Sequence, residues 1–98
     1  AVLTTHGRSR VNLINNGSGS GLTSAGTQRV LFQAREIGYG YDDYPKSQGY
    51  GFSISRVSWL TKVIEGMPHL RLLFVSEGLW AQRQDVIAIQ ATDKTLVY

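Results

Sequence analysis

The most regular pattern of apolar residues in the chain lies between residues 56 and 67. Apolar side chains recur there at intervals of three and four positions, which places them on one face of an α-helix. They are Val57, Leu60, Val63, Ile64 and Met67. Gly66 and Pro68 belong to the residue types that end helices, so the pattern predicts a helix over residues 56–66.

A second helix is predicted over residues 25–37. Its apolar face would be formed by Val30, Leu31, Ala34 and Ile37. Thr23 or Ser24 can cap its first turn, and Gly38 stands where helices commonly end. A strand is the alternative, because Phe32 lies off this face and alternates with Val30 and Ala34.

Four other stretches are predicted to form strands. They cover residues 9–15, 38–51, 69–80 and 85–98. The first alternates through Val11 and Leu13 and follows an expected hairpin turn at residues 6–10. The tyrosine-rich second stretch is expected to form a hairpin, and the last is expected to end in a short strand at residues 95–98.

Glycine and serine alternate just before the second predicted helix, and this composition is typical of a flexible connector. We therefore expect a Gly/Ser linker at residues 17–21. It would tether a strand-forming segment, residues 1–16, to a single α+β domain at residues 22–98. A natural glycine-rich loop is the alternative.

The predicted order of elements is strand, helix, hairpin, helix, strand and strand. The economical arrangement places two helices on one face of a mainly antiparallel sheet of four or five strands. We therefore expect an α+β fold, namely a ferredoxin-like two-layer sandwich. Because this fold supports many unrelated activities, function has to be argued from particular residues.

Composition narrows the choice of function only moderately. The 98 residues are 42% hydrophobic and 17% charged, as expected for one ordinary globular domain. The absence of cysteine excludes disulfides, thiolate metal sites and thiol nucleophiles. No apolar run is long enough to span a membrane. The net charge of +3 is spread along the chain and gives only a slight preference for acidic partners.

Residues capable of catalysis form no recognisable constellation. The two histidines, His6 and His69, are far apart in the sequence. Asp42 and Asp43 are adjacent, so in a strand their carboxylates would point to opposite faces. No phosphate loop, nucleophile elbow or HExxH motif is present. We therefore expect no enzymatic activity, no cofactor and no metal.

One stretch resembles a nucleic-acid-binding family. The run Gln48, Gly49, Tyr50, Gly51 and Phe52, followed by the helix over residues 56–66, is similar to the third strand and second helix of the RNA-recognition motif. The resemblance implies that Tyr50 and Phe52 stack on bases, with Lys46 and Arg10 offering phosphate contacts. The chain departs from the motif at Gln48, where the family has arginine or lysine.

The side chains of this stretch also alternate in a way that predicts a core strand. Tyr50, Phe52 and Ile54 share one face, and only glycines and serines lie on the other. Burial of each large side chain contributes on the order of 1.5–3 kcal/mol. We therefore expect Tyr50, Phe52 and Ile54 to pack against the helix over residues 56–66.

The apolar stretches near the end of the chain suggest an interaction surface. Apolarity on both faces suits an interior strand or a strand that pairs with another chain. The expected interaction edge comprises Val86, Ile87, Ile89, Leu96, Val97 and Tyr98. The sequence thus favours a non-enzymatic module for protein interaction, self-association or assembly. Binding of single-stranded RNA or DNA is the alternative.

Overall fold

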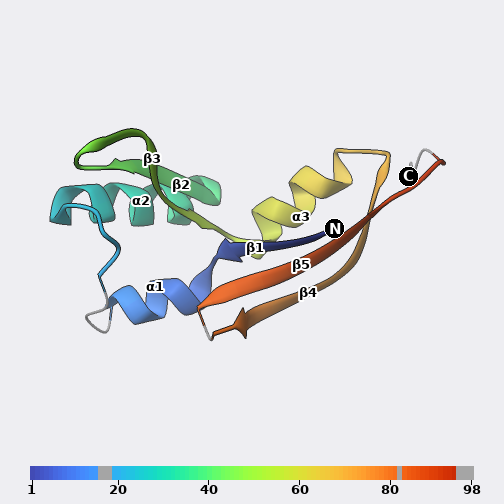
Figure 1. The fold of residues 1–98 in the computed structure, drawn as a ribbon, viewed down its shortest axis with the longest axis horizontal. Coiled ribbons are helices and arrows are strands. Elements are labelled where there is room, and N and C mark those ends of the chain that lie inside the picture. Colours follow the sequence, from blue (N-terminus) through green and yellow to red (C-terminus); the bar gives the residue numbers. More distant parts are fainter. Residues whose placement is uncertain (16–18, 82, 95–98) are drawn as a thin grey trace.

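The computed structural model describes residues 1–15, 19–81 and 83–94. These residues form three helices and five strands (Figure 1). In chain order the elements are β1 (Val2–His6), α1 (Arg8–Asn15), α2 (Ser24–Ile37), β2 (Tyr39–Tyr44), β3 (Ser47–Ser55), α3 (Val57–Glu65), β4 (Leu70–Trp80) and β5 (Gln84–Ala91). The α+β class is confirmed.

The strands form two antiparallel sheets instead of one. The larger sheet has the order β1-β5-β4, and the smaller one consists of β2 and β3. The expected single sheet of four or five strands is wrong, and the ferredoxin-like sandwich is not confirmed. The reason is that β1 pairs with β5 over all five of its residues, so the second side of β5 is closed to β3.

The two helices predicted from periodicity are confirmed. Thr23 caps α2 by accepting a hydrogen bond from the Gly26 amide, and Gly38 ends the helix with a left-handed backbone, φ 92°. The strand alternative for this stretch is wrong. α3 covers Val57–Glu65, close to the predicted range.

The beginning of the chain differs from the prediction. Residues 8–15 form helix α1 instead of a strand, and Gly7 links β1 directly to this helix instead of lying in a hairpin turn. Val11 and Ile14 lie three positions apart and therefore share a helical face, which packs against the core. The pair Val11 and Ile14 alone is too short a pattern to identify this helix from the sequence.

The segment before the Gly/Ser stretch forms part of the fold. β1 supplies an outer strand of the larger sheet, and the Ala1 amino group donates to the Ile89 carbonyl oxygen at 2.8 Å. Ser20, within the predicted linker, is buried and shares a 2.8 Å hydrogen bond with the Thr27 hydroxyl. The predicted strand at residues 95–98 and the linker residues 17 and 18 lie outside the described residues.

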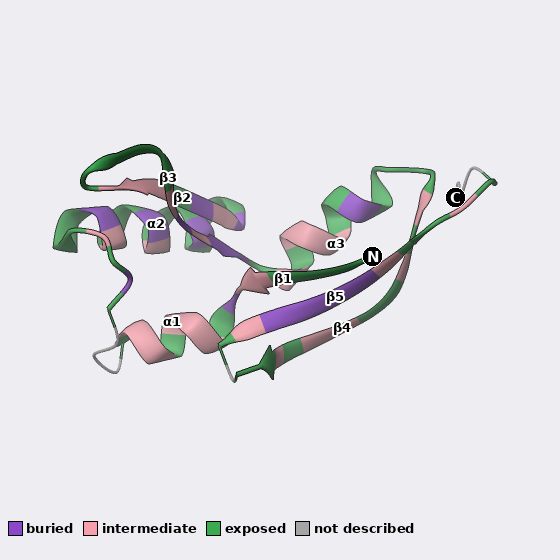
Figure 2. Cartoon of the chain, viewed as in Figure 1, coloured by how far each residue is buried: buried purple, intermediate pink, exposed green. Residues whose placement is uncertain are grey.

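The interior consists of two small cores. One lies between α2 and the β2-β3 hairpin and contains Val30, Ala34, Phe52 and Ile54. The other lies on the larger sheet, where β5 is the buried central strand (Figure 2). Helix α1 joins them, because Val11 and Ile14 reach the first core while the start of the helix contacts β4. The molecule is accordingly elongated, with extents of 45 × 26 × 23 Å.

The predicted core strand is only partly buried. Phe52 and Ile54 are buried as expected, at 5% and 2% exposure, whereas Tyr50 is 70% exposed near the tip of the hairpin. The helix that covers Phe52 and Ile54 is α2, so the expected packing against α3 is wrong. Gly40 permits this arrangement, since a side chain there would meet the Val30 carbonyl of α2.

Replacement of Phe52 and Tyr50 by alanine tests this division. Phe52→Ala should lower the free energy of unfolding by about 3–5 kcal/mol, because it leaves a cavity in the first core. Tyr50→Ala should cost about 1 kcal/mol or less, because the ring is mostly exposed and packs beside Tyr44 near the tip of the hairpin. Urea unfolding followed by circular dichroism measures both, and equal losses would contradict the placement of Tyr50.

Candidate functional site

Among the described residues of the larger sheet, the outer strand β4 carries the most exposed large apolar side chains. Among the described residues, β4 pairs only with β5, so its other side is open. Four large apolar side chains on this strand are between 48% and 63% exposed. They are Leu73, Phe74, Leu79 and Trp80. Exposed apolar residues gathered on one element indicate an interaction surface.

The two faces of β4 have different surroundings. Val75 lines a cavity together with Arg8 of α1 and Val57 of α3, so both helices begin on that face. Phe74 is the neighbouring residue in a regular part of the ladder, and its side chain therefore points to the opposite face. Its 48% exposure agrees with a sheet that is covered mainly from one side.

Three residues of the interaction edge predicted from the sequence lie on the central strand of the larger sheet. Val86 and Ile87 are buried and Ile89 is half-buried, all on the central strand β5. Ile87 is flanked by Leu3 of β1 and Val75 of β4, so β5 has no free edge. The two-sided apolarity was therefore the mark of an interior strand. The other three predicted residues, Leu96, Val97 and Tyr98, lie outside the described residues.

The residues carried over from the RNA-recognition motif do not form one exposed platform. Tyr50 is exposed, but Phe52 is buried and its ring stacks on His6 at 4.9 Å between centroids. The Arg10 guanidinium lies 5.5 Å from the Phe52 centroid, and its Nη2 donates to the Gly19 carbonyl oxygen at 2.6 Å. Lys46 is exposed in the turn between β2 and β3. Phe52 thus belongs to the core and cannot stack on a base.

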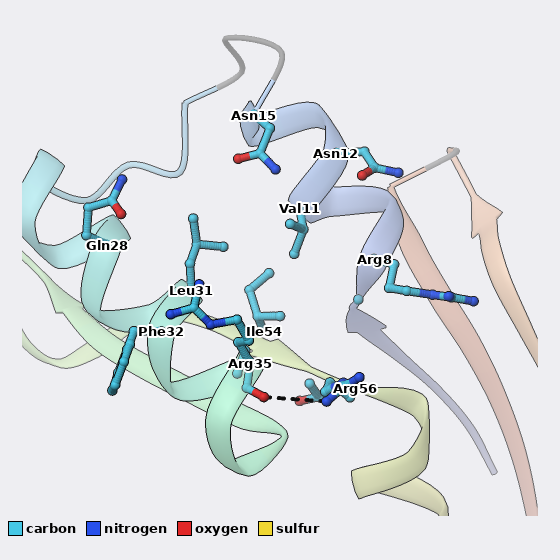
Figure 3. A pocket seen from close by; sticks show the side chains of 13 residues that line it. Arg8, Val11, Asn12, Asn15, Gln28, Leu31, Phe32, Arg35, Ile54 and Arg56 are labelled. Atoms are coloured by element: carbon cyan, nitrogen blue, oxygen red, sulfur yellow. Dashed lines mark hydrogen bonds between the residues drawn. The ribbon is translucent and has the colours of Figure 1, made fainter.

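A cleft that the sequence did not reveal lies between α1 and α2 (Figure 3). Its volume is about 940 Å³, and three arginines line it together with amide and apolar side chains. The arginines are Arg8, Arg35 and Arg56. No aspartate or glutamate is among the described residues that line it, so the cleft favours an anion.

The three arginines differ in the hydrogen bonds that they make to other groups of the protein. Arg8 donates two hydrogen bonds to the Glu77 carboxylate, at 2.8 and 2.7 Å. This pairing raises the pKa of Arg8 and lowers the pKa of Glu77. Arg35 Nε reaches Glu36 at 3.4 Å, and Arg56 Nη1 reaches the Arg35 carbonyl oxygen at 3.5 Å. Arg35 and Arg56 therefore retain more capacity to bind a ligand than Arg8 does.

These arginines are far apart in the sequence, which is why their meeting was not predicted. Arg35 belongs to the last turn of α2, Arg56 precedes α3, and Arg8 opens α1. The available signal was local: Leu31 and Arg35 are four positions apart and so lie on the same helical face. Arg8 joins them only because α1 packs near α2 in the folded chain, which the sequence does not reveal.

A buried acid stands at the end of the larger sheet. Asp85 is completely buried, and its Oδ1 accepts a hydrogen bond from the Gly78 amide at 2.9 Å. Burial is the main cause that raises the pKa of this carboxyl. Burial, followed by the charge of Arg10, lowers the pKa of His6. Because Asp85 has no exposed surface, it serves to fix the connection between β4 and β5.

Other classes of site are not found in the described part of the chain. No group of three or more histidine, aspartate or glutamate side chains is placed to hold a metal ion among the described residues. None of the described helices is both long and apolar enough to span a membrane.

Comparisons with known proteins place the chain in no family. It matches no protein-family model, no curated protein and no solved structure. Function must therefore be argued from the surfaces described above.

The buried carboxyl gives a testable dependence of stability on pH. Folded Asp85 holds its proton to a higher pH than the ordinary value of 3.8. In the pH range between the pKa of Asp85 in the unfolded chain and its higher pKa in the folded protein, the folded state binds more protons than the unfolded state. The contribution of Asp85 to the unfolding free energy therefore falls as pH rises from about 4. Urea unfolding of the wild type and Asp85→Asn at several pH values should show this fall in their difference. A difference independent of pH would contradict it.

Proposed function

We propose that this chain is a non-enzymatic assembly module that associates with a second copy of itself through the outer edge of β4. The observation that carries the proposal is that four large apolar side chains are exposed on this outer strand. An unpaired strand offers backbone donors and acceptors to another strand, and apolar side chains on it favour removal from water.

The spacing of these side chains supports association with an identical chain. Phe74 lies three positions before Glu77, and Trp80 lies three positions after it. A two-fold axis through Glu77 aligns two β4 strands antiparallel. It brings Phe74 of each copy opposite Trp80 of the other, with Leu73 and Leu79 as their neighbours in the sequence.

The negative charge of Glu77 lies at the centre of this two-fold arrangement. A two-fold axis near Glu77 brings the carboxylates of both copies toward each other, which would be unfavourable for two free charges. In each copy Glu77 is paired with Arg8 of α1 through two hydrogen bonds. This pairing offsets the repulsion at the axis.

Shifts in the register of β4 determine whether backbone pairing or burial of apolar side chains contributes more to association. Its register with β5 shifts between Leu72 and Phe74 and again between Ser76 and Trp80. Such bulges weaken a continuous backbone ladder on the outer side. Association is therefore driven chiefly by the four apolar side chains, with short backbone pairing between the shifts.

The alternative, binding of single-stranded nucleic acid by the Tyr50 to Phe52 stretch, has less support. It needs two exposed rings on one face of the sheet, and Phe52 is a core residue.

A lysine at Leu79 tests the proposed interface. Size-exclusion chromatography with light scattering should show a wild-type dimer whose fraction rises with concentration. Leu79→Lys should raise the dissociation constant about ten-fold or more, because it places a charge within an apolar contact. Ile37→Lys is the matched control: Ile37 is 69% exposed at the end of α2, away from β4, and its replacement should leave the dimer unchanged.

Circular dichroism establishes that both variants are folded. A wild type that stays monomeric up to millimolar concentration would overturn the proposal. Equal effects of the two substitutions would also overturn it, because they would show that association is not located on β4.

A further inference from the structure

The cleft has no acidic side chain among the described residues that line it. Two of its arginines have acidic partners outside the lining: Arg8 pairs with Glu77 at 2.7 Å, and Arg35 contacts Glu36 at 3.4 Å. Arg56 donates a 3.5 Å hydrogen bond to the Arg35 carbonyl oxygen. The planar guanidinium group suits the oxygens of a phosphate, to which it can donate two hydrogen bonds at once. A concave wall strengthens the attraction for an anion.

The positions of the arginines locate the anionic part of a ligand. Figure 3 shows Arg35 and Arg56 joined by the hydrogen bond from Arg56 Nη1 to the Arg35 carbonyl oxygen. Arg8 extends away from them, and its guanidinium is occupied by Glu77. That hydrogen bond ends on the backbone of Arg35, whose guanidinium extends toward Leu31. The phosphate group is assigned to Arg35 and Arg56 because neither has a carboxylate as close as the one that Arg8 binds.

The same cleft offers a surface for a flat apolar group. Phe32 is 56% exposed on α2, and the Arg35 guanidinium lies 5.4 Å from the centroid of its ring. Leu31 lies beside them on the cleft wall. Aromatic rings and arginine planes are the usual surfaces on which nucleobases stack.

Amide side chains on both walls can recognise polar atoms of such a ring. Asn12 and Asn15 come from α1, and Gln28 comes from α2. Each amide can donate and accept hydrogen bonds, as the edge of a base requires. Inorganic phosphate alone would leave these amides and the apolar wall without a contact. The volume of about 940 Å³ lies within the range of small-molecule sites.

We propose that the cleft between α1 and α2 binds a nucleoside phosphate, with the phosphate bound by Arg35 and Arg56 and the base against Phe32 and Leu31. The ligand is either a free nucleotide or one unit of a single strand, since both carry this chemistry. The site does not depend on association through β4.

Calorimetric titration with three probes tests the chemistry. Adenosine monophosphate should bind at least about ten-fold more tightly than inorganic phosphate or adenosine, because only it uses both parts of the cleft. Its affinity should fall with added salt. Absence of binding, or binding of phosphate as tight as that of adenosine monophosphate, would overturn the proposal.

Substitutions locate the binding. Arg35→Gln and Arg56→Gln should each weaken adenosine monophosphate about ten-fold, as expected for loss of a charge-assisted hydrogen bond. Phe32→Ala should remove the preference over inorganic phosphate. Arg71→Gln is the matched control, since Arg71 is exposed on β4 and does not line the cleft. If it weakens binding as much as Arg35→Gln, the attraction is non-specific and the proposal fails.

A short oligothymidylate, compared with thymidine monophosphate, identifies the source of the ligand. Much tighter binding of the oligomer, with a steep dependence on salt, assigns the site to a single strand, whereas equal binding assigns it to a free nucleotide. Leu79→Lys should leave adenosine monophosphate binding unchanged. This result separates a failure of the β4 interface from a failure of the cleft.

Discussion

The apolar residues of this chain are divided between two small cores, and this division determines the shape of the molecule. Because β1 closes the second side of β5, the β2-β3 hairpin has to bury its apolar face against α2 instead of joining the larger sheet. The Cα radius of gyration is 14.7 Å, above the roughly 13 Å of a compact chain of this length. An elongated molecule leaves much apolar surface outside, and both proposed sites lie on such surface.

Local signals were sufficient for the two predicted helices. Periodicity and end residues within a few positions identified α2 and α3, and the alternation around Phe52 identified a half-buried strand. Strand partners were not accessible in this way, since pairing is decided by contacts distant in the sequence. The short β1 has no long alternation of its own, and it becomes a strand because the central strand β5 needs a second neighbour.

The candidate sites were harder to predict for the same reason. The apolarity of β5 was recognised, but Ile87 is buried because neighbours occupy both sides, and this left β4 as the open edge. Tyr50 and Phe52 share a face, yet position along the hairpin leaves one ring outside and the other in the core. Arg35 and Arg56 meet only because the chain returns from β3 beside the end of α2.

The pairing of β1 with β5 also determines the order in which the chain can fold. Ala1 bonds to Ile89, 88 positions away, so the larger sheet must close a loop of nearly the whole chain. The α2-β2-β3 unit needs only neighbouring segments and pays far less entropy for closure. During synthesis this unit can form before β1 pairs, because its partner β5 is the last of the described strands to be synthesised. We therefore expect the larger sheet to be completed after the α2-β2-β3 unit.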